Sequence, residues 1–117
     1  MRIAIYVRVS TQRQALTQTI EQQIERLRAH VSGLGEWLAD DDIFRDDGYS
    51  GASLRRPGLD RLRDRAALAS FDRLYVTDPD RLARNYIHQV LLIEELQQHG
   101  CQVEFLNHPA RFSCKGK

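Results

Sequence analysis

The chain has 117 residues, a formal net charge of +1, 42% hydrophobic residues and 28% charged residues. This length is enough for one domain with its own core, and the composition is ordinary for a globular protein. The near-neutral charge gives no overall electrostatic signal for a nucleic-acid partner, although 15 of the 17 basic residues are arginines. The sequence shows no apolar run of membrane-spanning length, no secretory leader and no cysteine framework, so we expect a cytoplasmic protein.

Strands and helices are predicted to alternate along the chain. Alternating apolar residues indicate the strands, and apolar residues three or four positions apart indicate the helices. The expected strands are residues 2–10, a short one near 43–44, 72–77 and 101–106. The expected helices are residues 19–34, a helix from about 57, and 79–99 in one or two pieces. This order predicts an α/β fold of three layers, in which helices cover both faces of a mostly parallel sheet of four to five strands.

All three expected helices carry an apolar stripe that should face the sheet. In the helix 19–34, the stripe consists of Ile20, Ile24, Leu27 and Val31. In the helix from about 57, the stripe consists of Leu59, Leu62, Ala66 and Leu68. In the helix from 79, it includes Ile87, Val90, Leu91 and Leu96.

The first strand places three polar side chains on one face. Side chains alternate along a strand, so Tyr6, Arg8 and Ser10 point to the same side. A guanidinium and a hydroxyl two residues apart can act on the same ligand. The alternative is a half-exposed strand whose polar face meets water, because alternation is also the ordinary signature of such a strand.

A second polar segment begins at Asp78, where an N-cap aspartate followed by Pro79 predicts a helix start. Arg81 and Arg84 are three residues apart and would share a helical face near this end. Arginines beside the free N–H groups of a helix start favour an anion such as phosphate. The alternative is a surface ion pair between Asp80 and Arg84, worth about 0.3–0.5 kcal/mol.

These two segments are expected to meet. In a parallel sheet, sites form at the carboxyl ends of the strands, and both Ser10 and residues 80–84 follow such ends. The sequence therefore suggests a serine nucleophile that faces a phosphate pocket lined with arginines.

The middle of the chain offers weaker signals. Residues 48–56 form a loop of small residues that ends in Arg55 and Arg56, which could close over a phosphate or simply face solvent. The aspartates between residues 40 and 47 lack the spacing of a calcium loop, and we interpret them as solvated acids near a turn rather than a two-metal site. Nucleotide-binding glycine motifs are absent, and we expect no cofactor and no metal.

Four motifs in this order resemble the catalytic domain of the serine recombinases, the resolvase/invertase family with its large-integrase and transposon branch. They are Tyr6-x-Arg8-x-Ser10, the segment 19–23 with Gln23, the loop 44–51 with Ser50 followed by Arg56, and Asp80-Arg-Leu-Ala-Arg84. The resemblance covers residues 1–108 and implies a resolvase-like fold.

The resemblance implies a reaction in which the Ser10 hydroxyl attacks a DNA phosphodiester and forms a 5′-phosphoserine link without ATP or metal. Arg8, Arg81 and Arg84 would stabilise charge on the phosphoryl oxygens, and Asp80 or Arg81 would handle protons. The residues that would position the phosphate are Tyr6, Gln23, Ser50 and Arg56.

The resemblance implies DNA as the partner, a nucleoid-associated location, and dimers and tetramers in full-length members. It fails at about Pro109, so residues 109–117 are expected to be an irregular tail, and the family's assembly helix and DNA-binding domain are expected to be absent. Two alternatives remain open, a non-catalytic modulator of a full-length recombinase and an unrelated flavodoxin-like phosphate-binding module. An exposed apolar patch near residues 101–112 would favour the modulator.

Overall fold

Four parallel strands form the central sheet of the computed structural model, which describes residues 2–9, 19–48, 55–68 and 70–107. The strands are β1 (Ile3–Val9), β2 (Ile43–Asp47), β3 (Arg73–Val76) and β4 (Gln102–Phe105), in the spatial order β2-β1-β3-β4. The helices are α1 (Ile20–Gly33), α2 (Pro57–Ala67), α3 (Pro79–Leu82) and α4 (Tyr86–Gln98), with a short 3-10 turn η2 (Asp40–Asp42) before β2. The predicted α/β fold with a parallel sheet is confirmed.

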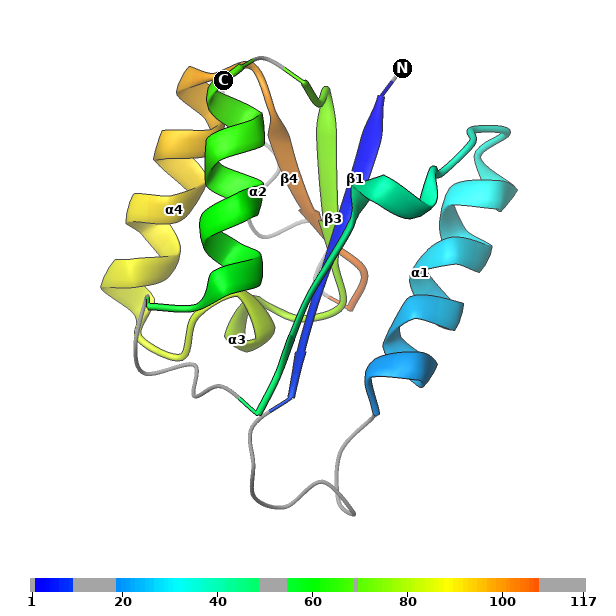
Figure 1. Cartoon of the computed structure of the whole chain (residues 1–117), viewed down its shortest axis with the longest axis horizontal. Helices are drawn as coiled ribbons and strands as arrows, with labels where there is room; N and C mark the ends of the chain where they lie inside the picture. The colour runs from blue at the N-terminus through cyan, green and yellow to red at the C-terminus, as the bar shows by residue number, and fades with distance from the viewer. Residues whose placement is uncertain (1, 10–18, 49–54, 69, 108–117) are drawn as a thin grey trace.

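Helices cover both faces of this sheet (Figure 1). One core cluster joins α1 to the aliphatic face of β1, and the other joins α2, α3 and α4 to the opposite face. Because β1 also pairs with a strand on each side, all seven of its residues are buried. The alternative of a half-exposed first strand is therefore wrong.

Two of the predicted core stripes need correction. Leu68 is 77% exposed, because α2 ends at Ala67 and the chain then leaves the helical phase. In α4, Ile87 and Leu91 are 64% and 53% exposed. The face of α4 that meets the sheet consists of Gln89, Leu92, Ile93 and Leu96. This set keeps the three- and four-residue spacing of a buried helical face, so the other apolar residues of α4 point elsewhere.

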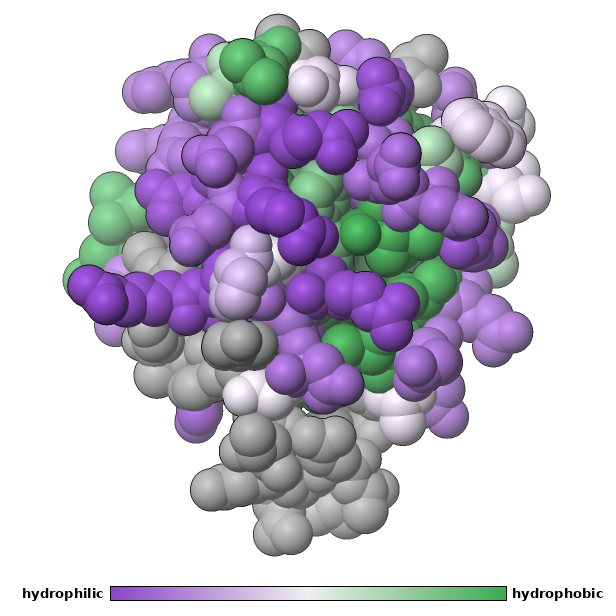
Figure 2. Space-filling model, in the orientation of Figure 1, coloured by the Kyte–Doolittle hydropathy of each residue, from purple (hydrophilic) through white to green (hydrophobic). Residues whose placement is uncertain are grey.

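The surface over α2 and α4 is mainly hydrophilic, with separate hydrophobic groups, one of them at the edge where α4 lies (Figure 2). Among the described residues, no helix is both long and apolar enough to cross a membrane. The part of the chain that the structure describes also has no group of three His, Cys, Asp or Glu side chains placed to hold a metal ion.

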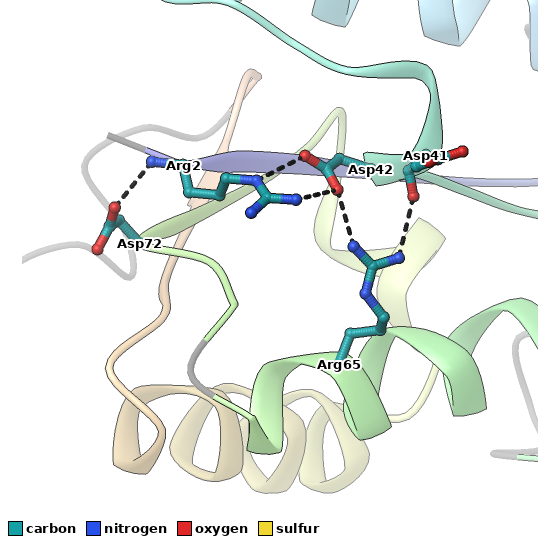
Figure 3. A network of polar contacts seen from close by, with 5 residues as sticks. All are labelled: Arg2, Asp41, Asp42, Arg65 and Asp72. Atoms are coloured by element: carbon teal, nitrogen blue, oxygen red, sulfur yellow. Dashed lines mark hydrogen bonds and ion pairs between the residues drawn. The ribbon is translucent and has the colours of Figure 1, made fainter.

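A buried aspartate ties the amino ends of the strands together (Figure 3). The Asp42 carboxylate, only 1% exposed, accepts hydrogen bonds from Arg2 Nε at 3.1 Å and from Arg65 Nη2 at 3.1 Å. The Arg2 backbone N–H donates to Asp72 at 2.8 Å. Asp42 therefore joins η2 to the start of β1 and to α2, so its interpretation as a solvated acid is wrong.

Candidate active site at the carboxyl edge of the sheet

Arg8 and Arg81 meet at the carboxyl ends of the strands. Arg8 is the second-last residue of β1, and its guanidinium donates to the Arg81 carbonyl at 3.1 Å and to the Asp80 carbonyl at 2.8 Å. In return, Arg81 Nη1 donates to the Arg8 carbonyl at 3.2 Å. This exchange fixes α3 against the end of β1, as the topology predicted for these two segments.

Gln23 supports the same end of β1 from the α1 side. Its side chain is fully buried, and its amide nitrogen donates to the Arg8 carbonyl at 3.1 Å while its amide oxygen accepts from the Arg8 N–H at 3.3 Å. A capping box formed by Thr19 and Gln22 starts α1 just before this residue. Gln23 therefore holds the backbone of β1 one strand position before its last residue.

Arg56 occupies a buried position beneath α3. Although it precedes the first residue of α2, it is 1% exposed. Its guanidinium donates to the Leu82 carbonyl, to the Tyr6 hydroxyl at 3.1 Å, and to the Arg81 carbonyl at 3.4 Å. The sequence suggested a loop arginine that moves over a phosphate, and the structure instead fixes this guanidinium inside the domain. Arg55, its neighbour, is exposed.

Asp46 is the residue that sequence reasoning missed at this edge. It lies in β2, is 2% exposed, and accepts from the Tyr6 hydroxyl at 2.7 Å. It also accepts from the Gly58 and Leu59 backbone N–H groups at 2.7 and 2.9 Å, which are orphan donors of the first turn of α2. A carboxylate here suits the positive end of a helix. The available signal was the two-residue spacing of Phe44 and Asp46, which places this acid on the same face of the strand as a core phenylalanine.

Burial and like charge shift the pKa values at this edge. Burial is the largest cause that lowers the pKa of Arg8, and the neighbouring Arg56 guanidinium adds to it. Burial also raises the pKa of Tyr6, and the hydrogen bond to Asp46 acts in the same direction. Tyr6 therefore stays neutral and can donate its proton to the carboxylate. The repulsion between guanidiniums would be relieved by an anion bound beside them.

Arg84 does not lie in the same helix as Asp80, although the sequence suggested that it would. The helix α3 ends at Leu82, and Ala83 is extended with φ −162° and ψ 143°. Arg84 is exposed in the joint before α4, so it does not share a helical face with Arg81, and the four-residue pairing with Asp80 loses its basis. The joint is held by Gln89, whose side chain donates to the Ala83 carbonyl at 2.7 Å.

The remaining predicted site residues, Ser10 and Ser50, lie outside the described residues. Ser10 follows Val9, the last residue of β1, and Ser50 lies in the loop after β2. The Gly48 N–H donates to the Val9 carbonyl at 2.8 Å, so the last described residues before Ser10 and before the segment that contains Ser50 are hydrogen-bonded to each other.

Residues 3–114 match the family model described as Resolvase, N terminal domain. A curated relative from Bacillus subtilis (strain 168), described as a putative DNA recombinase, is 39% identical over 106 residues. That alignment covers 90% of this chain and 20% of the relative, so the chain spans only a small part of the relative's length.

Two solved structures have similar sequences and folds. The N-terminal catalytic domain of TP901-1 integrase has a TM-score of 0.85 and 32% identity, covering 93% of this chain and 80% of that chain. The C-terminal catalytic domain of ISC1926 TnpA, an IS607-like serine recombinase, has a TM-score of 0.79 and 26% identity, covering 91% of this chain and 70% of that chain. These matches exclude the alternative of an unrelated flavodoxin-like module. The chain belongs to the resolvase N-terminal domain family of DNA recombinases and has the fold of a serine recombinase catalytic domain.

Proposed function

We propose that this domain breaks and rejoins DNA through Ser10. The serine oxygen forms a bond to the scissile phosphorus, the bond from phosphorus to the 3′ oxygen breaks, and the serine proton ends on that 3′ oxygen. The product is a 5′-phosphoserine link and a free 3′ hydroxyl. Attack by another 3′ hydroxyl reverses these steps and releases the serine. The bonds formed and broken therefore balance without ATP or a metal ion.

The observation that carries this proposal is the meeting of Arg8 and Arg81 at the end of β1, two residues before Ser10. Serine is a weak nucleophile at neutral pH, and guanidiniums that stabilise charge on the phosphoryl oxygens lower the barrier without a histidine base. Arg8 is held in place by backbone carbonyls of α3, so its orientation is fixed before a phosphate arrives. Preorganised charge of this kind costs little reorganisation during the reaction.

The other candidate residues take roles that follow from their positions. Exposed Arg84 supplies a guanidinium to the phosphate, and exposed Asp80, beside Arg81, takes part in proton transfer. Tyr6, Gln23 and Arg56 act as positioning residues, since their described contacts reach β1, Asp46 and α3. Ser50 would contact the phosphate from the loop after β2. DNA is the proposed partner, and dimers or tetramers are the proposed assembly.

The test is a covalent-trapping assay. The chain is fused to the remaining part of a full-length relative whose DNA site is known, and the chimera is incubated in EDTA with supercoiled DNA that carries this site. Mass spectrometry then locates any nucleotide adduct. We expect an adduct on Ser10 that is absent in Ser10→Ala and unchanged in Ser32→Ala, a matched control at an exposed serine of α1.

An adduct on another residue, or one that forms only when Mg²⁺ replaces EDTA in a parallel incubation, would contradict the proposal. A folded chimera that binds the site and forms no adduct would favour the non-catalytic modulator. The apolar patch that would favour a modulator is not present over residues 101–107, where Cys101, Val103 and Phe105 are buried, and residues 108–112 lie outside the described part of the chain.

A further inference from the structure

The only tryptophan of the chain is exposed. Trp37 lies in the loop between α1 and η2, and 78% of its surface is accessible to solvent. Leu34, three residues earlier, is 47% exposed. Tryptophan is highly buried on average in folded proteins, so an indole exposed to this extent calls for an explanation beyond the packing of this domain.

An open groove of about 480 Å³ lies beside this indole. Its lining consists of Arg28, Trp37, Leu38, Ala39, Asp40 and Asp41. Leu38 is buried and belongs to the core cluster on the α1 side of the sheet, which gives the groove an apolar base. In Figure 1, the loop between α1 and η2 lies at the end of the domain where β1 begins, and α3 lies at the other end. The groove is therefore separate from the candidate active site.

The groove lining carries two carboxylates, those of Asp40 and Asp41, and one guanidinium, that of Arg28, so the net charge of the lining is −1. The Arg65 guanidinium also reaches this turn, where it donates to the Asp41 carbonyl at 3.3 Å. Of the three consecutive aspartates of η2, only Asp42 turns inward, where Arg2 and Arg65 neutralise it. Asp40 and Asp41 are exposed, and the loose ion pair from Asp40 to Arg28 at 3.5 Å joins two solvated side chains, 90% and 47% exposed. Such a pair contributes little to folding.

We propose that this groove docks a basic segment of a partner protein. An arginine or lysine side chain from that segment would lay its aliphatic stem across the Trp37 indole and direct its cation to Asp40 and Asp41. A cation on an aromatic face and an opposing carboxylate both favour this occupant. The net negative charge of the groove lining disfavours a nucleic acid. The groove therefore serves a protein contact away from the edge proposed for DNA.

The test uses the intact chain, in which Trp37 is the only tryptophan and therefore the source of the indole fluorescence. The probe is a blocked peptide of alternating leucine and arginine, and the control peptide has glutamine in place of arginine. We expect a saturable change in emission with the arginine peptide alone, and weaker binding at high salt. The double variant Asp40→Asn, Asp41→Asn should weaken binding by about fivefold, since two exposed ion pairs are lost. The matched control Asp64→Asn, at an exposed position of α2, should not change it.

Several results would overturn the proposal. They are the absence of saturation, equal binding of the glutamine peptide, or equal weakening by Asp64→Asn. A short DNA duplex that produces the same saturable change would identify an anionic occupant instead. A concentration-dependent emission change without peptide, together with a dimer in sedimentation, would assign the groove to a second copy of the chain.

Discussion

Replacing Asp46 by asparagine tests how the candidate active site is held together. The Asp46 carboxylate is buried in β2 and accepts three hydrogen bonds, from Tyr6 Oη at 2.7 Å and from the N–H groups of Gly58 and Leu59 at 2.7 and 2.9 Å. One of its oxygens serves Gly58 and the other serves both Tyr6 and Leu59. The amide of asparagine has nearly the same shape but only one acceptor oxygen.

Either orientation of that amide places its NH₂ group against at least one backbone N–H of α2. A hydrogen bond to a charged group contributes about 1.5–3 kcal/mol, and an unsatisfied buried donor costs about 1–3 kcal/mol. The helix start also loses a negative charge at its positive end, which is worth up to about 2 kcal/mol where it is partly buried. These effects overlap, so we expect Asp46→Asn to lower the free energy of unfolding by about 2–4 kcal/mol.

Urea denaturation followed by circular dichroism measures this loss, provided that the dependence of the unfolding free energy on urea stays the same in both proteins. The matched control is Asp47→Asn, at the next residue of β2, which is exposed and should change stability by less than about 0.5 kcal/mol. A loss below about 1 kcal/mol for Asp46→Asn, or equal losses for both variants, would refute the reasoning.

Two further predictions concern a tight backbone contact and alkaline pH. Gly58→Ala should cost about 1–3 kcal/mol in urea denaturation because its new methyl group would lie 2.5 Å from the Arg45 carbonyl oxygen. Gly33→Ala, which has open space around it, should be neutral or stabilising, and a loss similar to that of Gly58→Ala would contradict this explanation. Burial raises the pKa of Cys101 to about 12 and also raises the pKa of Tyr6. The unfolded chain releases these protons at lower pH than the folded chain, so stability should fall above about pH 9, by about 1.4 kcal/mol per pH unit for the thiol alone. Stability measured from pH 8 to 10 should depend less on pH in Cys101→Ala, and an unchanged slope would contradict the assignment.

The order and type of the elements could be predicted because the local signals agree with the fold. The predicted strand 2–10 is observed as Ile3–Val9, and the predicted helix 19–34 as Ile20–Gly33. Because strands and helices alternate along the chain, only a few topologies were possible. Parallel strands that are joined by helices form one sheet, and the helices cover its two faces. The sequence allowed the segment 79–99 to be one helix or two, but it did not predict where the break between α3 and α4 would fall.

The burial of charged side chains could not be predicted in the same way. Tyr6 and Asp46 are 40 residues apart, and Arg56 and Tyr6 are 50 residues apart. Composition assigns a charged residue to the surface unless its partner is known, and these partners come from different strands and helices. The acids of residues 40–47 therefore looked like one solvated group, whereas the fold divides them between a structural ion pair, a helix cap and an exposed rim.

Most of the charged side chains whose burial the sequence did not predict gather at the edge proposed as the active site. Packing alone would fill the space beneath α3 with apolar side chains, because buried ion pairs are often no more stabilising than hydrophobic residues of similar volume. This domain instead buries Arg8 and Arg56 there and satisfies their donors with backbone carbonyls, the Tyr6 hydroxyl and, through it, Asp46. Local rules that fail together at one edge of a sheet are expected at functional sites. A cluster of fixed guanidiniums is suited to bind an anion, which would relieve the repulsion between the positive charges. The DNA phosphate proposed for this edge is such an anion.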